Sequence, residues 1–244
     1  MTSLRRTAAC AAVLLACSAC AAIPSQRASF RNPTDVARLS RSAEGIAGIE
    51  IQAGVAEVRV VGGIADSIVV GVAMRSQDRE RLTDICIPRS ELIAEPDERR
   101  LVVRLAQRSR DQCGEVWEVA VPAGMPVTVH AEVGKIFAEG LAGGFAARIT
   151  GTGSIDATLA GGPVDARVAV GDVRVDSREA SYRSVRISTN VGRVHVEAAG
   201  MRLSPPRHGA GARFESNGDG RHDARLRSDV GDVTFIVARA PRER

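Results

Sequence analysis

Hydrophobic and polar residues alternate along the chain from residue 46 onwards, in short runs separated by glycine or by charged turns. Alternation with a period of two is typical of β-strands, whose side chains point to opposite faces in turn. The runs at 49–51, 56–60 and 67–72 predict strands, and those at 91–94 and 101–105 flank the charged segment 95–99, which predicts a hairpin. The pattern therefore predicts an all-β protein.

A short phrase of the type Val-Gly-x-Val returns through residues 127–237. Its central glycines are spaced by 19, 18, 21 and 39 residues, and they are Gly134, Gly153, Gly171, Gly192 and Gly231. A recurring period of this length is typical of stacked repeats. We expect each glycine to lie at a corner between two strands, because glycine takes positive φ without steric cost.

Strands of four or five residues are too short for helical crossovers, so the repeat predicts a parallel β-solenoid of about five or six rungs. An aromatic content of only 3% fits its narrow core. The alternative is an antiparallel sandwich or barrel, which also has short, evenly spaced strands. The predicted organisation is a signal peptide (1–20), a flexible tether (21–44), a small β cap module (45–121), the repeats (122–237) and a charged tail (238–244).

The first 20 residues have the composition of an export signal. Arg5 and Arg6 precede an uncharged apolar stretch at 7–16, which is too short to remain as a membrane-spanning helix. The sequence Leu-Leu-Ala-Cys ending at Cys17 resembles a bacterial lipobox, and Cys20 is the competing lipidation site. An ordinary secretory signal cut nearby is the third possibility. We therefore expect an exported protein, anchored to a bacterial membrane by an N-terminal lipid and facing the periplasm or the exterior.

Export also bears on the remaining cysteines. Cys86 and Cys113 lie in the predicted folded region, and two such cysteines in an oxidising compartment predict a disulfide.

The formal net charge is +4, which falls to +2 when Arg5 and Arg6 are removed with the signal. This charge is mild, and no tract of basic residues with interleaved aromatics occurs. Nucleic acid is therefore not an expected partner.

An arginine recurs upstream of the glycine corners, at a position that alternation places on the outer face. The members of this predicted strip are Arg148, Arg167, Arg186, Arg213 and Arg225. Stacked like charges repel, so the strip requires anions nearby. It could bind an acidic polysaccharide or phosphate head groups, or it could be neutralised internally, for example by Asp165 beside Arg167.

Catalytic and metal chemistry are weakly indicated. Outward carboxylates could act as an acid and base pair on a polysaccharide, and the candidates are Asp156, Asp172, Asp176 and Asp232. Most of them adjoin glycine corners, where turn chemistry alone favours aspartate. His130, His195, His208 and His222 lack the close spacing of metal ligands, so we expect neither a metal nor a cofactor.

The introductory strands, the strand at 117–122 that ends in Val-Pro, and the five glycine corners together resemble the bacterial putative-adhesin β-solenoid family. The resemblance covers residues 46–237 and implies a domain of unknown function on an exported or membrane-tethered protein. It brings no catalytic residues. We therefore expect a non-enzymatic, adhesin-like binding or scaffold module of the cell envelope, which could contact another envelope protein. The alternatives are an enzyme acting on envelope or extracellular polysaccharide and a purely structural envelope component.

Overall fold

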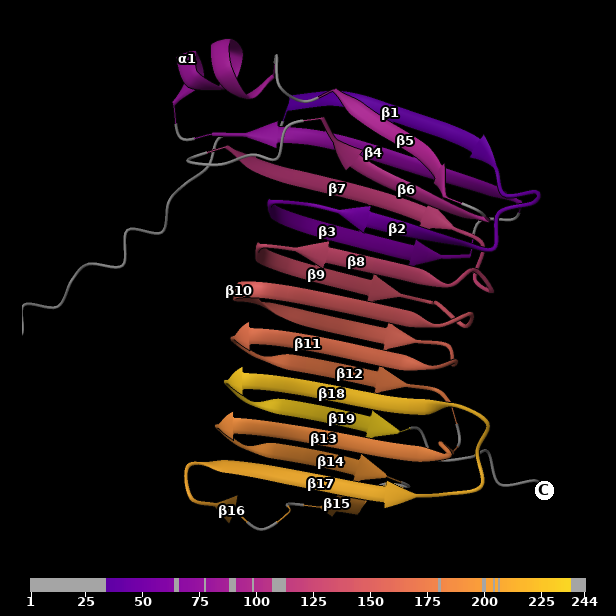
Figure 1. The fold of residues 1–244 in the computed structure, drawn as a ribbon, viewed down its shortest axis with the longest axis vertical. Helices are drawn as coiled ribbons and strands as arrows, with labels where there is room; N and C mark the ends of the chain where they lie inside the picture. Colours follow the sequence, from indigo (N-terminus) through magenta and orange to yellow (C-terminus); the bar gives the residue numbers. More distant parts are fainter. Residues whose placement is uncertain are drawn as a thin grey trace, which may run out of the picture.

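The computed structural model describes residues 34–63, 66–76, 78–87, 91–97, 99–106, 113–179, 181–198, 201–203, 205 and 207–237. These residues form one sheet of 19 strands, which folds back around a single core and is nearly closed (Figure 1). Its two facing layers of strands are named wall A and wall B here. Along most of the stack, each level contributes one strand to each wall, and such a pair of strands is called a layer of the stack.

Wall A contains ten strand segments. In their order along the stack they are β1 (Thr34–Ser42), β4 (Ser67–Arg75), β7 (Gly114–Val121), β3 (Val55–Gly62), β9 (Val133–Glu139), the second half of β10 (Phe145–Leu159), β12 (Val173–Ser177), β19 (Val233–Val237), β14 (Val194–Ala198) and β15 (Met201–Leu203).

Wall B also contains ten. They are β5 (Leu92–Asp97), β6 (Arg100–Leu105), β2 (Gly48–Gln52), β8 (Val127–Ala131), the first half of β10, β11 (Val164–Val170), β18 (Asp223–Val230), β13 (Ser184–Val191), β17 (Gly211–Asn217) and β16 (Arg207–His208). Strand β10 belongs to both walls because it turns the corner within its own length.

The all-β prediction is confirmed, but the prediction of a parallel β-solenoid is wrong, because the sheet is mixed. Antiparallel pairs occur at one end between β1 and β4, β4 and β7, and β5 and β6. At the other end they join β13 to β17, β17 to β16, and β14 to β15. Some of these pairs are hairpins of consecutive strands, such as β5–β6 at one end and β16–β17 at the other.

The strands also depart from chain order at two places. The β2–β3 layer lies between β6–β7 and β8–β9. The β18–β19 layer lies between β11–β12 and β13–β14, so the C-terminal strands are inside the stack (Figure 1). Residues of both 45–121 and 122–237 contribute to one core.

Strand β1 (Thr34–Ser42) lies along β4, in a part of the chain for which the sequence predicts a flexible tether. Val36 and Leu39 pack against the core from this strand. Two apolar contacts among polar residues were too weak a signal to predict a strand from sequence.

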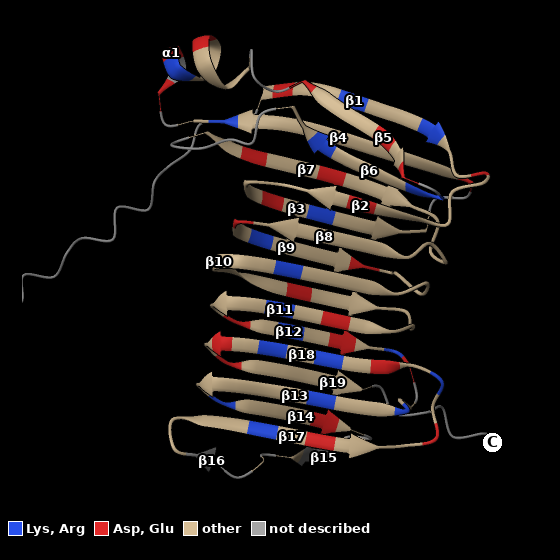
Figure 2. Cartoon of the chain, in the orientation of Figure 1, with Lys and Arg blue, Asp and Glu red and all other residues tan. Residues whose placement is uncertain are grey.

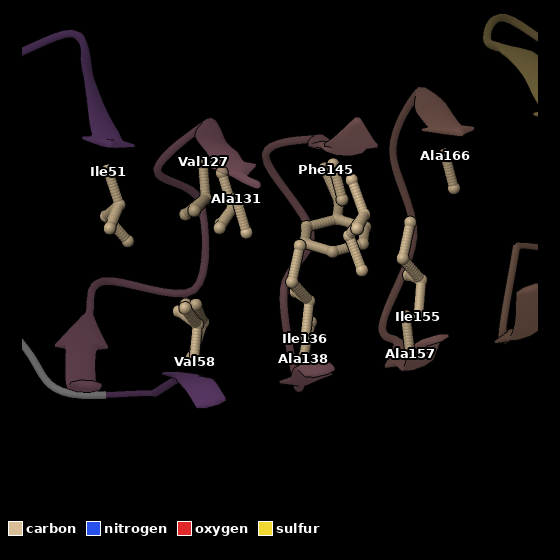
Figure 3. Close-up of a cluster of buried hydrophobic side chains, with 14 of the residues drawn as sticks. Ile51, Val58, Val127, Ala131, Ile136, Ala138, Phe145, Ile155, Ala157 and Ala166 are labelled. Carbon is tan, nitrogen blue, oxygen red and sulfur yellow. The ribbon is translucent and has the colours of Figure 1, made fainter. Parts of the chain in front are cut away.

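The inward side chains form one continuous core between the walls. Figure 3 shows Ile51, Val127 and Ala131 on one side, facing Val58 and Ile136 on the other. Trp117, the single tryptophan, is fully buried among the N-terminal layers. Near the opposite end, the Tyr182 and Phe235 rings meet edge to face with centroids 5.5 Å apart.

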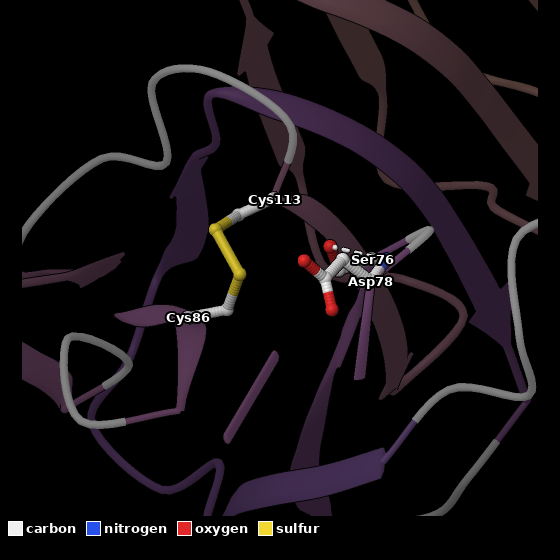
Figure 4. The surroundings of a disulfide bond; sticks show 4 residues. All are labelled: Ser76, Asp78, Cys86 and Cys113. Atoms are coloured by element: carbon white, nitrogen blue, oxygen red, sulfur yellow. Dashed lines mark hydrogen bonds between the residues drawn. A yellow bond between two sulfur atoms is a disulfide. The ribbon is translucent and has the colours of Figure 1, made fainter. Parts of the chain in front are cut away.

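The predicted disulfide is confirmed. Cys86 and Cys113 are bonded, both are buried, and their Cα atoms lie 5.7 Å apart (Figure 4). Cys86 ends a short helical segment made of α1 (Arg79–Arg81) and the π-helical turn Leu82–Cys86. No helix within the described ranges has both the length and the apolar character needed to cross a bilayer.

Candidate functional site

The outer face of wall B carries two columns of arginine over β10, β11, β18, β13 and β17. In the first column, the register between neighbouring strands places one residue of each strand beside the next. From β10 to β17 these residues are Arg148, Arg167, Arg227, Ser188 and Arg213. In the second column, two residues along, Arg225 aligns with Arg186. Figure 2 shows basic segments following one another down this wall. Neighbouring strands lie about 4.8 Å apart, so the guanidinium groups are close enough to repel each other.

The predicted strip is therefore divided between two adjacent columns. Arg148, Arg167 and Arg213 share the first column, whereas Arg186 and Arg225 belong to the second. The residue that aligns with Arg167 on β18 is Arg227, which sequence reasoning did not include. Its signal was available: Arg227 lies two residues after Arg225 and shares its face.

Part of this charge is neutralised by carboxylates on the same strands. Within single strands, Arg167 pairs with Asp165 at 2.8 Å, and Arg227 with Asp229 at 3.0 Å. Arg213 pairs with Glu215 at 2.6 Å. The hydrogen bonds that Arg167 donates to Asp165 raise the pKa of its guanidinium. These pairs are exposed, and exposed pairs contribute little to stability.

Arg148, Arg186 and Arg225 differ from the other arginines of this face. Among the residues that the structure describes, none of the three has a carboxylate within ion-pair distance. The carboxylate expected for Arg225, that of Asp223, is instead bonded to Arg183 and Ser184. The Arg183 guanidinium, with help from the Ser184 hydroxyl, lowers the pKa of Asp223 to about 2. On wall B the five strands thus present six outward arginines and four outward carboxylates.

In the N-terminal part of wall B, the charged side chains are balanced differently. There Gln52 donates a hydrogen bond to Glu50, and Arg100 pairs with Glu50 at 3.2 Å. The Gln52 hydrogen bond, followed by that from Arg100, lowers the pKa of Glu50. The excess of positive charge therefore belongs to the C-terminal half of wall B.

Three of the four carboxylates considered for catalysis have structural partners. Asp172 accepts the backbone N–H of Asp232, and Asp232 in turn accepts that of Arg193, each at 2.8 Å. Asp176 pairs with Arg174 at 3.0 Å on wall A. Asp156 lies beside Arg174 in register on the same wall. The aspartates at the corners thus bind backbone groups of the next layer.

The corner glycines lie in a row along the stack. A Cβ atom on Gly153 would clash with the carbonyl oxygen of Gly134, and one on Gly171 with that of Gly153. The row continues with Gly231 next to Gly171 and then Gly192 next to Gly231, which is the order of the layers in space and not in sequence. Inside the corner, the Ser228 hydroxyl donates to the Gly171 carbonyl at 2.7 Å.

The histidines do not gather into a metal site. No group of three or more potential metal ligands occurs within the described part of the chain. His130 lies 3.9 Å from Glu50, and His222 lies 3.5 Å from Glu179. His195 is on wall A, in register with Thr234. The proposed lipidation sites, Cys17 and Cys20, lie outside the described residues.

No protein-family model matches the chain, and no curated protein matches it. Among solved structures, it is similar to a putative cell adhesion protein from Clostridium sporogenes, with a TM-score of 0.58 and 13% identity over 85% of this chain and all of that one. A putative adhesin from Bacteroides fragilis matches over 83% of this chain and 96% of its own, with 6% identity and a TM-score of 0.25. The first likeness shows a similar fold, and the second is too distant to show one.

Proposed function

We propose that this chain is an exported, lipid-anchored, adhesin-like module of the bacterial cell envelope, without enzymatic activity, which binds an acidic polysaccharide on the C-terminal half of wall B. The fold similarity to a putative cell adhesion protein supports the adhesin-like role. The lipobox-like sequence before Cys17 supports the anchor.

The observation that carries the binding role is the pair of arginine columns. Guanidinium groups about 4.8 Å apart repel one another unless anions lie between them. Arg148 and Arg186 have no carboxylate at ion-pair distance among the described residues, so an external anion would relieve the repulsion. Arginine also presents a planar fork of donors that matches sulfate and carboxylate groups.

Retention on a column of immobilised dextran sulfate tests this role. The double variant Arg167→Ser/Arg186→Ser removes one paired and one unpaired arginine, and we expect it to elute at clearly lower salt than the wild type. The matched control is Arg174→Ser/Arg59→Ser, which makes the same charge change on wall A, where Arg174 is paired with Asp176. Equal losses in both double variants would show that net charge alone governs retention, and the binding role would be rejected.

The anchor has its own test. Cells expressing the protein are labelled with radioactive palmitate, and the label is followed in the Cys17→Ser, Cys20→Ser and double variants. We expect Cys17→Ser to remove the label and Cys20→Ser to retain it. Label that persists in the double variant would refute both proposed sites, and loss of label in Cys20→Ser alone would move the anchor to Cys20.

A further inference from the structure

The first arginine column is interrupted at one position, where β13 carries Ser188 between Arg227 of β18 and Arg213 of β17. A short side chain in a row of long ones leaves a depression one strand wide. An open hollow of about 770 Å³ lies here, and its lining includes Ser188, three arginines (Arg186, Arg213 and Arg227) and one carboxylate, Glu215. We call it the arginine hollow.

The geometry places cations on three sides of this hollow. Arg227 and Arg213 are separated by two strand spacings, about 9.6 Å, with Ser188 between them. Arg186 lies two residues before Ser188 on the same face, about 6.6 Å away along the strand. Side chains as long as arginine can converge across these separations on one small group.

The donors around the hollow exceed what its carboxylates use. Arg213 is paired with Glu215 and Arg227 with Asp229, and each guanidinium has five N–H donors. Arg186 has no carboxylate at ion-pair distance among the described residues, and its register neighbours are Arg225 and Glu215. A second, smaller hollow of about 450 Å³ adjoins the first and shares Arg186 and Arg213.

We propose that the arginine hollow is a subsite for one sulfate or carboxylate group of an acidic polysaccharide, bound between Arg186, Arg213 and Arg227 above Ser188. This inference rests on the proposed function and names the part of wall B that selects the ligand. The remaining arginines of the first column, Arg167 and Arg148, continue in line from the hollow and would contact further charges of the same polymer.

The position of the hollow favours a polymer over a lipid surface. It lies near the end of the stack at β17, whereas the chain enters the fold at β1, at the opposite end (Figure 1). Eight strand spacings separate β5 from β17 along wall B, roughly 38 Å. A lipid at the N-terminus would therefore be attached at the end of the stack opposite the hollow.

The deciding variant is Ser188→Arg, because it fills the hollow while adding a positive charge. We expect its affinity for dextran sulfate to fall about tenfold, although a face that attracts the polymer by charge alone would bind more tightly. Arg186→Ser should also lose about tenfold. The matched comparison is Arg148→Ser, which removes another arginine with no ion pair among the described residues, about 14 Å from Ser188. Because Arg148 would contact the polymer outside the hollow, this variant should lose less than Arg186→Ser, about threefold.

Affinities are measured by isothermal titration calorimetry with dextran sulfate, carboxymethyl dextran and uncharged dextran, and fluorescence of Trp117 checks the fold of each variant. Tighter binding by Ser188→Arg, or equal losses in Arg186→Ser and Arg148→Ser, would overturn the subsite and leave the proposed function intact. Failure of the wild type to bind either charged dextran would reject both. Arg186-dependent binding to vesicles containing anionic lipid, without binding to charged dextran, would overturn the inference in favour of lipid.

Discussion

The carboxylate of Asp172 accepts a hydrogen bond from the backbone N–H of Asp232 at 2.8 Å, although the two residues are 60 positions apart in sequence. Asp232 repeats the contact one layer further on, where it accepts the backbone N–H of Arg193. The aspartate that follows a corner glycine therefore links neighbouring layers through a backbone group. This contact explains the recurrence of aspartate at the corners without any catalytic role.

Replacing Asp172 should weaken the link between β12 and β19. We expect Asp172→Ala to lower the free energy of unfolding by about 1 kcal/mol, the usual net contribution of one hydrogen bond. Asp172→Asn keeps an acceptor oxygen and should lose less. Urea denaturation followed by circular dichroism measures both, and an Asp172→Ala variant as stable as the wild type would show that water replaces the carboxylate at no cost.

The backbone of the neighbouring layer lies close to each corner glycine. This contact, in addition to the positive φ angle, should make the corner glycines irreplaceable. Gly171 and Gly63 have similar φ angles, +132° and +136°. A Cβ atom would clash with the Gly153 carbonyl at Gly171, but would meet nothing within 4 Å at Gly63. We expect Gly63→Ala to cost about 1–2 kcal/mol from strain alone, and Gly171→Ala to cost at least about 2 kcal/mol more. Similar thermal midpoints for the two variants would contradict the clash.

The Cys86–Cys113 bond should stabilise the N-terminal end of the stack. It closes a loop of 27 residues, for which restriction of the unfolded chain contributes about 3–4 kcal/mol. The double variant Cys86→Ser/Cys113→Ser should lose about that much, measured by urea denaturation followed through Trp117. Wild-type protein unfolded in the presence of a reductant is the control and should show the same loss. A loss confined to the double variant would indicate faulty packing of the serines.

Tyr182 should make the protein sensitive to alkali. It is the single tyrosine, and burial raises its pKa to about 12 from an ordinary value of about 10. Because the pKa of Tyr182 is higher in the folded state than in the unfolded chain, its protonated hydroxyl favours folding. This contribution to the free energy of unfolding is complete below pH 10 and is lost as the pH rises towards 12. Absorbance at 295 nm reports its ionisation directly.

The matched variant is Tyr182→Phe, which lacks the ionisable hydroxyl. It also loses the 2.6 Å hydrogen bond between Tyr182 and Ser177. We expect it to be less stable than the wild type at pH 8, and to change less between pH 10 and 12. A wild-type tyrosine that titrates near pH 10 in the folded protein would contradict its burial.

Local features of this fold could be predicted from the sequence, because they depend on residues that are close together in the chain. Alternation predicted the strands, and Gly171 or Gly192 marked corners because the phrase around each is short and self-contained. The disulfide was predicted from two cysteines in a chain whose first 20 residues predict export. The hairpin of β5 and β6 could likewise be predicted, since a charged turn joins two alternating runs.

The order and direction of the strands could not be predicted in this way. The segments around Val168, Ile187 and Leu226 have the same pattern, so each could stack on either of the others, and nothing local shows that Leu226 lies between them. The same ambiguity affected the site. Arg225 and Arg227 both point outward, and only the register along the stack decides that Arg227 joins Arg167.

The inserted position of β18–β19 has a consequence for how the protein is made. A chain synthesised from its N-terminus delivers Asp223–Val237 after the other described strands, yet these residues form an interior layer. The stack therefore cannot be completed until these residues have been made. A stop codon after residue 222 would remove a central layer of the molecule and leave β11 and β13 without their common neighbour.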